Sequence, residues 1–348
     1  MNRRGFLKIS SLAAISVFLG DLRMVDAKNF RKKTDFHARA ILPSYIEGLK
    51  KLKIDAQAEE GFPLPKWSAE NHLKFMEDAG IDFTILSMAT PHIYNDKDKE
   101  KISCEVAREI NEEFSALCKK FPDKFGFVAT LPMPSVEGSI SEIKFATEKL
   151  GALGVKVASN SDGIYLGDEI LNPIFEELNR KKSLVILHPS PARTLPKEKV
   201  VTGRVMALFE YPADTTRAVL NLLVNGTLEK FSEIKLVVPH CGSFLPYMKQ
   251  RASAMFQMLA GMKMMSPVNI LAGMKNLYFD LAGDPMPEEM DILLKISNAE
   301  KFLYGSDYPY VPAEILLKKK NLLDAELAKR NLTSKIYLNN SEKILEGF

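Results

Sequence analysis

The sequence has few cysteines and no glycine-rich fingerprint for binding a dinucleotide. Its 348 residues include three Cys. An odd count argues against a disulfide framework. Cys104 and Cys118 also fall on one predicted helix, roughly 21 Å apart and too far for a bond. An open doubly wound sheet is the weaker alternative fold, because its usual G-x-G-x-x-G signature is absent.

Neither sign of charge dominates once the first 27 residues are set aside. The whole chain has 47 basic and 44 acidic side chains and a formal net charge of +3. Residues 1–27 contain four of the basic and two of the acidic side chains, which leaves 43 against 42 in the rest. A nearly neutral remainder gives no argument for a nucleic-acid partner, and we expect none.

The chain also lacks a long apolar run at its N-terminus. Asn-Arg-Arg-Gly-Phe-Leu-Lys at residues 2–8 resembles a twin-arginine export signal, and the apolar stretch Ile9–Leu19 follows. About 11 residues are too few to span a bilayer, which takes roughly 20. Small residues at 25–27 offer a cleavage site before Lys28. We therefore predict a signal peptide at 1–27, one mature domain at 28–348, no stable membrane span after processing, and a periplasmic location; an uncleaved anchor is the alternative.

Short apolar runs, mostly without polar alternation, occur through most of the chain and alternate with helical patterns. Such runs are typical of parallel strands buried on both faces. They are Thr34–His37, Phe83–Met88, Phe125–Thr130, Gly154–Ala158, Leu184–His188, Lys235–Pro239, Leu277–Asp280 and Phe302–Gly305. Eight strands with helices between them predict an α/β fold, the (β/α)₈ TIM barrel.

Between the predicted strands, helix signals are clear at two places. Ser68 can cap a helix that runs to Asp78, and a long amphipathic helix over Lys101–Phe121 stops before Pro122. The segments Ser44–Trp67 and Ser190–Tyr211, after strands 1 and 5, are long insertions. Because loops of this length in a compact domain often cover binding sites, we expect both to act as lids over the active-site face.

A group of methionines follows strand 6 at positions 255, 258, 262, 264 and 265. Methionine is unbranched and flexible, and it often fills gaps in a core. We therefore expect a helix that covers the barrel. A dimer surface, with a second copy of the chain as the partner, or a substrate entrance remain alternatives.

Four side chains with metal or proton chemistry stand where predicted strands end: His37, His188, His240 and Asp307. The carboxyl ends of parallel strands meet on one face of a barrel. Two imidazoles and a carboxylate held there can bind a divalent metal, and a third imidazole can transfer protons. His72 and His92 do not end strands, and we expect structural roles for them.

Several segments together carry a family resemblance over nearly all of residues 35–345. They are Pro65–Ser68, Phe125–Phe127, Tyr165–Asp168, Asp214–Arg217, His240–Pro246 and Gly305–Pro309. The chain resembles the amidohydrolase-related group that contains aminocarboxymuconate-semialdehyde decarboxylase and other metal-dependent carboxy-lyases, and within it the 6-methylsalicylate decarboxylases match best. The resemblance implies that His37, His188 and Asp307 are metal ligands and that His240 is the active-site His beside the metal.

The chain departs from the family pattern at Arg39. The family's first strand ends His-x-His, whereas here it ends His37-Ala38-Arg39. A guanidinium is always protonated and cannot ligate a metal. Three protein ligands and a water can still make a catalytic zinc site, so we expect a retained but weakened divalent-metal site, with zinc as the metal. Arg39 is predicted to bind a carboxylate of the substrate.

The resemblance and the strand-end residues together predict a metal-dependent carboxy-lyase. The expected reaction removes CO₂ from an aromatic or unsaturated carboxylic acid such as a salicylate-like compound. His240 or Asp307 would supply the proton. Two alternatives remain: a metal-dependent hydrolase of a lactone, ester or amide with the same residues, and a non-catalytic binding protein that has lost its metal because of Arg39.

Overall fold

The computed structural model describes residues 31–93, 97–193 and 205–346. The predicted signal peptide and its cleavage site lie outside these residues, as does the middle of the predicted insertion after strand 5. No helix in the described part is long and apolar enough to cross a membrane.

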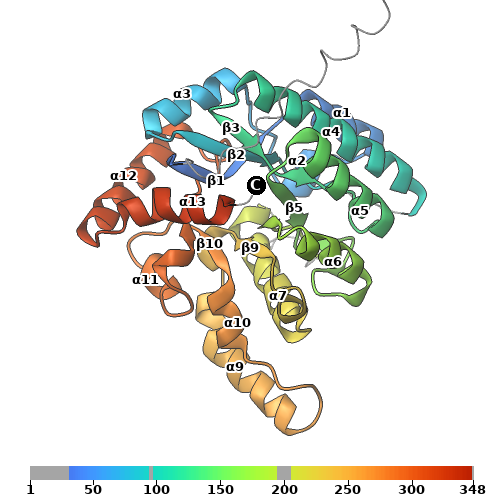
Figure 1. The fold of residues 1–348 in the computed structure, drawn as a ribbon, viewed down its shortest axis with the longest axis vertical. Coiled ribbons are helices and arrows are strands. Elements are labelled where there is room, and N and C mark those ends of the chain that lie inside the picture. Colours follow the sequence, from blue (N-terminus) through green and yellow to red (C-terminus); the bar gives the residue numbers. More distant parts are fainter. Residues whose placement is uncertain (1–30, 94–96, 194–204, 347–348) are drawn as a thin grey trace, which may run out of the picture.

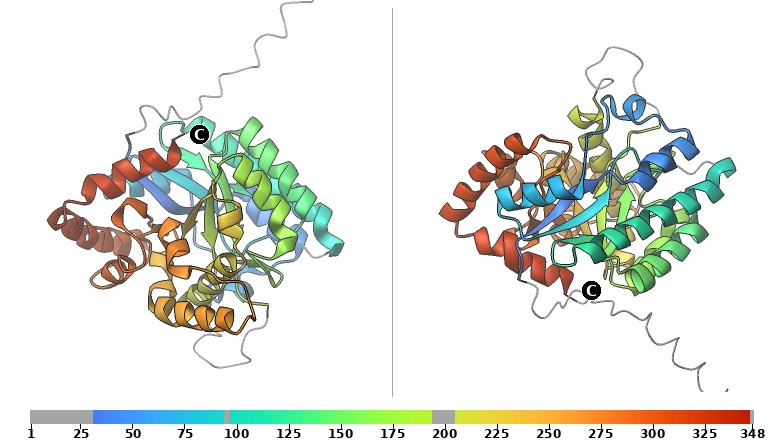
Figure 2. Two further views of the ribbon diagram at one scale, coloured as in Figure 1. Left: turned by 60° about the horizontal axis from the view of Figure 1, so that its bottom comes forward. Right: turned by 90° about the horizontal axis from the view of Figure 1, so that it is seen from above.

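Parallel strands form the centre of the molecule, and helices surround them (Figures 1 and 2). In the described ranges the strands are β1 (Thr34–Ala40), β2 (Phe83–Met88), β3 (Phe125–Phe127), β4 (Ala129–Thr130), β5 (Gly154–Ala158), β8 (Leu184–His188), β9 (Lys235–Val238), β10 (Tyr278–Asp280) and β11 (Phe302–Leu303). They pair in the order β1-β2-β3 and β4-β5-β8-β9-β10-β11. Every predicted strand is confirmed, and β3 and β4 together make the third.

The two sheets are parts of one barrel. Val128, between β3 and β4, donates its N–H to Leu86 of β2, and Leu153 donates to Phe127. At the other seam, Phe36 of β1 donates its N–H to the Tyr304 carbonyl at 2.9 Å, beyond the end of β11. These backbone bonds join the first strand to the last, so the predicted TIM barrel is confirmed.

Gly305 allows this seam to close. A Cβ at Gly305 would lie 2.7 Å from the Cβ of His37, which is closer than side chains tolerate. The buried Asp35 carboxylate bridges the same seam, because its Oδ1 accepts the N–H groups of His37 at 2.9 Å and Ser306 at 3.1 Å. The end of β1 is therefore held tightly against the loop that carries Asp307.

Helices follow the strands and bury their apolar faces against them. Their bounds are α1 (Pro43–Leu52), α2 (Ala56–Glu60), α3 (Ala69–Ala79), α4 (Glu100–Lys120), α5 (Val136–Phe145), α6 (Asn172–Arg180), α7 (Glu210–Val224), α8 (Thr227–Lys230), α9 (Leu245–Gly261), α10 (Ile270–Asn276), α11 (Glu289–Leu293), α12 (Ala313–Lys329) and α13 (Asn340–Leu345). The predicted helices correspond to α3, which Ser68 caps, and to α4. A two-stranded antiparallel ribbon, β6 (Asn160–Ser161) with β7 (Ile164–Tyr165), follows β5.

The expectation that the methionine-rich helix fills gaps over the barrel is wrong. This helix is α9, which extends with α10 away from the strands (Figure 1). Met255 and Met258 of α9, and Met262 and Met264 just after it, are 39–68% exposed. Because these side chains face solvent, the methionines form an apolar surface instead of a core.

Candidate active site

The structure brings the four predicted strand-end residues together. His37 lies in β1, His188 ends β8, His240 follows β9, and Asp307 follows β11. One ligand atom from each of the three imidazoles lies within 4.8 Å of the others, a spacing that can hold a metal ion. Asp307 joins them, since its Oδ1 is 3.2 Å from Nε2 of His37.

A carboxylate that the sequence analysis missed fixes the orientation of His37. Asp280, the last residue of β10, has its Oδ2 2.7 Å from Nδ1 of His37 and is fully buried. Its Oδ1 accepts the main-chain N–H of His240 at 3.0 Å. Burial disfavours a charged imidazole, but the Asp280 carboxylate outweighs it and raises the pKa of His37. Asp280 ends a predicted strand, so the criterion that selected Asp307 could have found it.

Arg39 is buried beside His37 instead of facing the cavity. Its side chain is 1% exposed. Nη1 donates to Oγ of Ser87 at 2.9 Å, Nη2 lies 2.5 Å from Nε2 of His37, and Nη2 is 3.7 Å from Oδ1 of Asp307. With Nδ1–H of His37 directed at Asp280, its Nε2 is the acceptor for the guanidinium. The predicted substrate-binding role of Arg39 stays a prediction.

His188 presents its outer nitrogen to the cluster. Its Nδ1 lies 3.0 Å from the Pro189 carbonyl, an arrangement in which Nδ1 donates and Nε2 keeps a free lone pair. Burial, followed by the positive charges of Arg39 and Lys156, holds the pKa of His188 well below its usual range. A neutral imidazole with a free Nε2 is the form that ligates metals.

His240 and Asp307 face each other across the same centre. Nε2 of His240 is 3.9 Å from Oδ2 of Asp307, and Nδ1 of His240 is buried with no hydrogen-bond partner among the described residues. Burial lowers the pKa of His240 to about 4. Burial also opposes ionisation of Asp307, but His37 and Arg39 outweigh it and lower the pKa of Asp307.

Both of these residues have a backbone conformation that is uncommon for side chains other than glycine. The φ angle is +55° at His240 and +63° at Asp307. Such left-handed conformations persist where the surroundings impose them, and they cluster at functional sites. Here the Asp280 carboxylate holds the backbone of His240, and the carbonyl of His37 accepts the N–H of Asp307 at 2.7 Å.

A cavity of about 880 Å³ opens over His188, His240 and Asp307. Part of its wall comes from the two predicted lid segments and the start of α9, namely Glu60, Phe62, Val205, Leu208, Tyr211, Phe244 and Tyr247, and further residues of the wall follow β10 and β11, among them Asp284, Glu289 and Tyr310. Most of these side chains are apolar or aromatic. The described parts of both insertions therefore lie at the site, as predicted.

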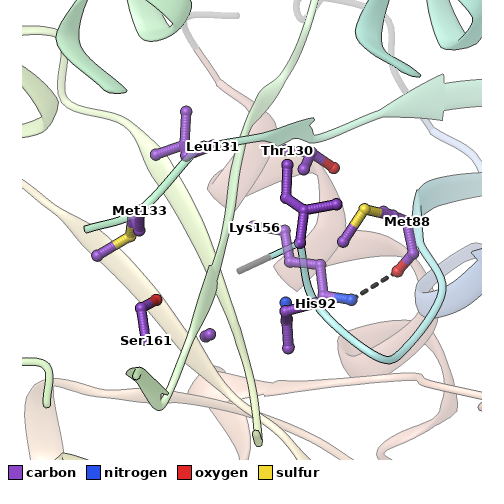
Figure 3. Close-up of a pocket in the computed structure, with 9 residues that line it drawn as sticks. Met88, His92, Thr130, Leu131, Met133, Lys156 and Ser161 are labelled. Atoms are coloured by element: carbon purple, nitrogen blue, oxygen red, sulfur yellow. Dashed lines mark hydrogen bonds between the residues drawn. The ribbon is translucent and has the colours of Figure 1, made fainter. Parts of the chain in front are cut away.

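Two further cationic or imidazole side chains lie behind this centre. Lys156 of β5 is 3% exposed, and its Nζ donates to the Met88 carbonyl at 2.5 Å (Figure 3). His92 lines the same small cavity, and its ring centroid is 5.7 Å from that of His188. Burial lowers the pKa of both groups. His92 therefore packs directly on the site, and its expected structural role stays a prediction.

The donor set fits a divalent metal apart from one contact. Nε2 of His37, Nε2 of His188 and a carboxylate oxygen of Asp307 are ligands that zinc and similar ions take. Asp280 supports His37 through Nδ1, as carboxylates do behind metal-bound imidazoles. Arg39 is the exception, because Nη2 engages the lone pair of His37 that a metal would need. A metal at this site must displace the guanidinium from Nε2.

The TIM-barrel fold and the His and Asp residues at its strand ends are features of a known protein family. Residues 34–347 match the family model described as Amidohydrolase. The chain belongs to this family, which confirms the resemblance found in the sequence.

Curated relatives place the chain more narrowly. It is 30% identical over 302 residues to the decarboxylase yanB of Aspergillus niger, a match that covers 84% of this chain and 81% of yanB. It is 28% identical over 310 residues to 6-methylsalicylic acid decarboxylase of Penicillium expansum, covering 87% and 94%. The chain is thus an enzyme of the decarboxylase branch of the family.

A solved structure shares the fold. The 5-carboxyvanillate decarboxylase of Novosphingobium aromaticivorans, solved with manganese and 4-hydroxy-3-methoxy-5-nitrobenzoic acid, superimposes with a TM-score of 0.78 at 20% identity. The match covers 92% of this chain and 97% of that one. At this identity the likeness concerns the fold alone.

Proposed function

We propose that this enzyme removes CO₂ from a hydroxylated aromatic carboxylic acid, a salicylate-like compound. The observation that carries the proposal is the convergence of His37, His188, His240 and Asp307 at the floor of a cavity of about 880 Å³ with largely apolar walls. An aromatic ring suits such walls, and a divalent metal held by the floor would attract a carboxylate. The decarboxylase relatives support the same reaction.

We further propose that His37, His188 and Asp307 hold one divalent metal, and that this metal is zinc. When bound, it would supply positive charge that neutralises the substrate carboxylate and stabilises the negative charge of the reacting ring. Arg39 would add a second, permanent positive charge next to His37 and Asp307, and a direct contact with the substrate's carboxylate is its proposed role.

His240 is the proposed proton donor to the ring carbon that bears the carboxylate. The new C–H bond forms first; the C–C bond then breaks, and its electron pair returns to the ring as CO₂ leaves. Asp307 is the alternative donor, but its neighbours His37 and Arg39 favour its ionised form. Because His240 is neutral near pH 7, the proton that it gives to the ring carbon would have to be supplied to it by water as the transfer takes place.

Release of CO₂ tests this function. Purified enzyme, supplied with zinc and separately with manganese, would be incubated with hydroxybenzoates and with a panel of lactones. We expect CO₂ and the matching phenol from at least one hydroxybenzoate. Hydrolysis of a lactone without release of CO₂ would favour the hydrolase alternative, and neither activity would favour the binding protein.

His188→Ala tests the metal ligands separately from activity. Elemental analysis of the wild type should give about one equivalent of metal, and the variant should lose most of it. His92→Gln is a matched control, since His92 contacts His188 but is not a proposed ligand. Equal metal contents in the wild type and His188→Ala would exclude His188.

We propose that residues 1–27 direct export by the twin-arginine route and that residues 28–348 act in the periplasm. N-terminal sequencing of periplasmic protein should find Lys28 or a close neighbour first.

A homodimer formed through the exposed methionines of α9 is our proposal for the oligomeric state. Light scattering would show a monomer mass if it is wrong.

A further inference from the structure

Glu60 is a buried carboxyl group in the wall of the active-site cavity, and none of the steps above uses it. It is the last residue of α2, in the insertion after β1, and it is 1% exposed. Residues at both ends of α2 fix the position of this helix. Asp55 caps α2 by accepting the N–H groups of Gln57 and Ala58, and Gly61 ends the helix in a left-handed conformation with φ +81°.

The two oxygens of Glu60 have different surroundings. The Tyr211 hydroxyl donates to Oε2. Oε1 is buried and has no hydrogen bond of ordinary geometry among the described residues, although the Thr90 side chain lies close enough to the carboxyl group to favour its ionised form. An unsatisfied buried oxygen costs about 1–3 kcal/mol, so such an atom in a cavity wall is a site for a ligand's polar group.

The neighbours of Glu60 place it beside the reacting centre. Tyr211, which holds Oε2, has its ring centroid 5.7 Å from that of His188. Thr90 and Tyr310 line the same cavity and are bonded to each other, with the Tyr310 hydroxyl donating to the Thr90 carbonyl at 2.8 Å. A ligand that reaches His188 therefore passes close to Glu60.

We propose that Glu60 is a specificity-determining residue that binds a hydroxyl group on the substrate's ring through Oε1; this proposal rests on the proposed function. A carboxylate would be repelled by ionised Glu60, and its partner would be the metal proposed at the floor of the cavity. An apolar substituent would leave Oε1 unsatisfied. A hydroxyl group fits best because it can both donate and accept.

The charge state of Glu60 is consistent with this role. Burial raises the pKa of Glu60 to about 7, although the side chains of Tyr211 and Thr90 and the charges of Lys156 and Arg39 oppose the rise. Both protonation states are therefore populated near neutrality. The ionised form accepts a hydrogen bond from a phenol, and the neutral form can donate one.

A purely structural role is the competing account. The bond from Tyr211 joins the insertion after β1 to the start of α7, and Glu60 could serve only to hold these segments together. The two accounts differ in one measurable property. Loss of a structural link weakens all ligands alike, whereas loss of a ligand contact weakens only ligands that carry the hydroxyl.

The test uses pairs of benzoates that differ only by a hydroxyl or a methyl at the 2-, 3- or 4-position. Dissociation constants would be measured calorimetrically for the wild type, Glu60→Gln, Glu60→Leu and Tyr211→Phe. We expect the wild type to prefer the hydroxyl at one position by about 10-fold or more. Glu60→Leu should lose most of that preference, Glu60→Gln should retain part of it, and Tyr211→Phe should weaken both members of a pair by the same factor.

The proposal would be overturned if the wild type showed no preference for the hydroxyl at any position. It would also be overturned by an unchanged preference in folded Glu60→Leu. If Glu60→Leu does not fold, an unchanged preference in Glu60→Gln would have the same meaning. Equal loss for both ligands in all three variants would support the structural account and overturn it as well. Because binding is measured directly, failure of the decarboxylase proposal is distinct: it would appear as an absence of CO₂ release in the wild type, whatever the ligand preference.

Discussion

Two sides of the active site differ in how their polar atoms are used. On the β1 side, His37 and Arg39 are bound to each other and to Asp280, Ser87 and Asp307. On the side of the insertions, Glu60 and His188 border the cavity, and each keeps an oxygen or nitrogen without a partner among the described residues. We call the first side closed, because its polar side chains bind one another, and the second open, because its two side chains each keep an atom without a partner among the described residues.

This difference suits the two sides to different tasks, metal binding on the closed side and substrate selection on the open side. The closed side holds charge in a fixed arrangement, so it can set the affinity for a metal and the electrostatic potential at the floor. The open side presents atoms that have no partner among the described residues, so it can set which substrate binds. His240 and Asp307 lie between them. Substitutions on the two sides should therefore have different kinetic signatures.

The largest effect on turnover is expected at the boundary between the two sides. His240→Ala removes the proposed proton donor and should lower kcat by at least about 10²-fold while the fold and most of the metal are retained. Kinetics on an identified substrate and elemental analysis would measure both. His240→Gln is a suitable control for side-chain volume. Near-normal turnover in either variant would return His240 to a structural role.

Arg39 tests whether the closed side contacts the substrate. If it binds a substrate carboxylate, Arg39→Gln should raise KM by roughly 10- to 150-fold and leave the metal content alone, as expected for a lost charge-assisted bond of about 1.5–3 kcal/mol. If Arg39 instead competes with the metal for Nε2 of His37, Arg39→His should tighten metal binding. Chelator competition and kinetics on both variants distinguish the two.

A third possibility is that Arg39 contributes neither to substrate binding nor to metal binding. In that case neither Arg39→Gln nor Arg39→His would change the metal affinity or the kinetics. Ser87→Ala, which removes only the hydrogen bond to Nη1, provides the matched control, and it should have a smaller effect than either substitution of Arg39.

Asp280→Asn should have an effect similar to or smaller than that of the Arg39 substitutions. The amide can no longer hold Nδ1 of His37 as a charged acceptor, so metal affinity should fall about 10- to 100-fold. Asp280 also holds the backbone of His240, so turnover should fall further than metal loading alone explains. Equal metal affinity in Asp280→Asn and the wild type would mean that His37 is not a ligand.

Sequence reasoning reached the barrel and the strand-end residues because both follow from a local pattern. Buried parallel strands are short apolar runs, and a polar side chain at the end of such a run, like His188 or Asp307, lies on the active-site face. Asp280 met the same criterion but lies behind His37, which only the three-dimensional arrangement shows.

Other features had no local signal. Glu60 lies in an insertion whose sequence gives no indication that α2 would fold over the site and meet Tyr211. The direction of Arg39 was equally hidden, because a residue two positions after His37 points to the same face whether it binds a ligand or His37 itself. The methionines of α9 were misassigned because their spacing does not show that the helix leaves the barrel.

His72 should have the smallest effect on the site and still a measurable one on stability. It is fully buried, its Nδ1 accepts from the indole N–H of Trp67 at 3.0 Å, and burial lowers its pKa to about 3. The unfolded chain, with a pKa near 6.5, binds the proton more readily, so folding stability is lost as the pH falls from 6.5 towards 3. The loss is about 1.4 kcal/mol per pH unit, or about 2 kcal/mol at pH 5.

His72→Gln should therefore flatten the pH dependence of the unfolding free energy between pH 6.5 and 5, as measured by urea titration. Its activity at pH 7.5 should equal that of the wild type, because His72 contacts neither the cavity nor the proposed ligands. Parallel slopes in the two proteins would show that His72 titrates in the folded state as it does in the unfolded one. A loss of activity without a change in slope would instead place His72 in the functional class that His37 and His188 define.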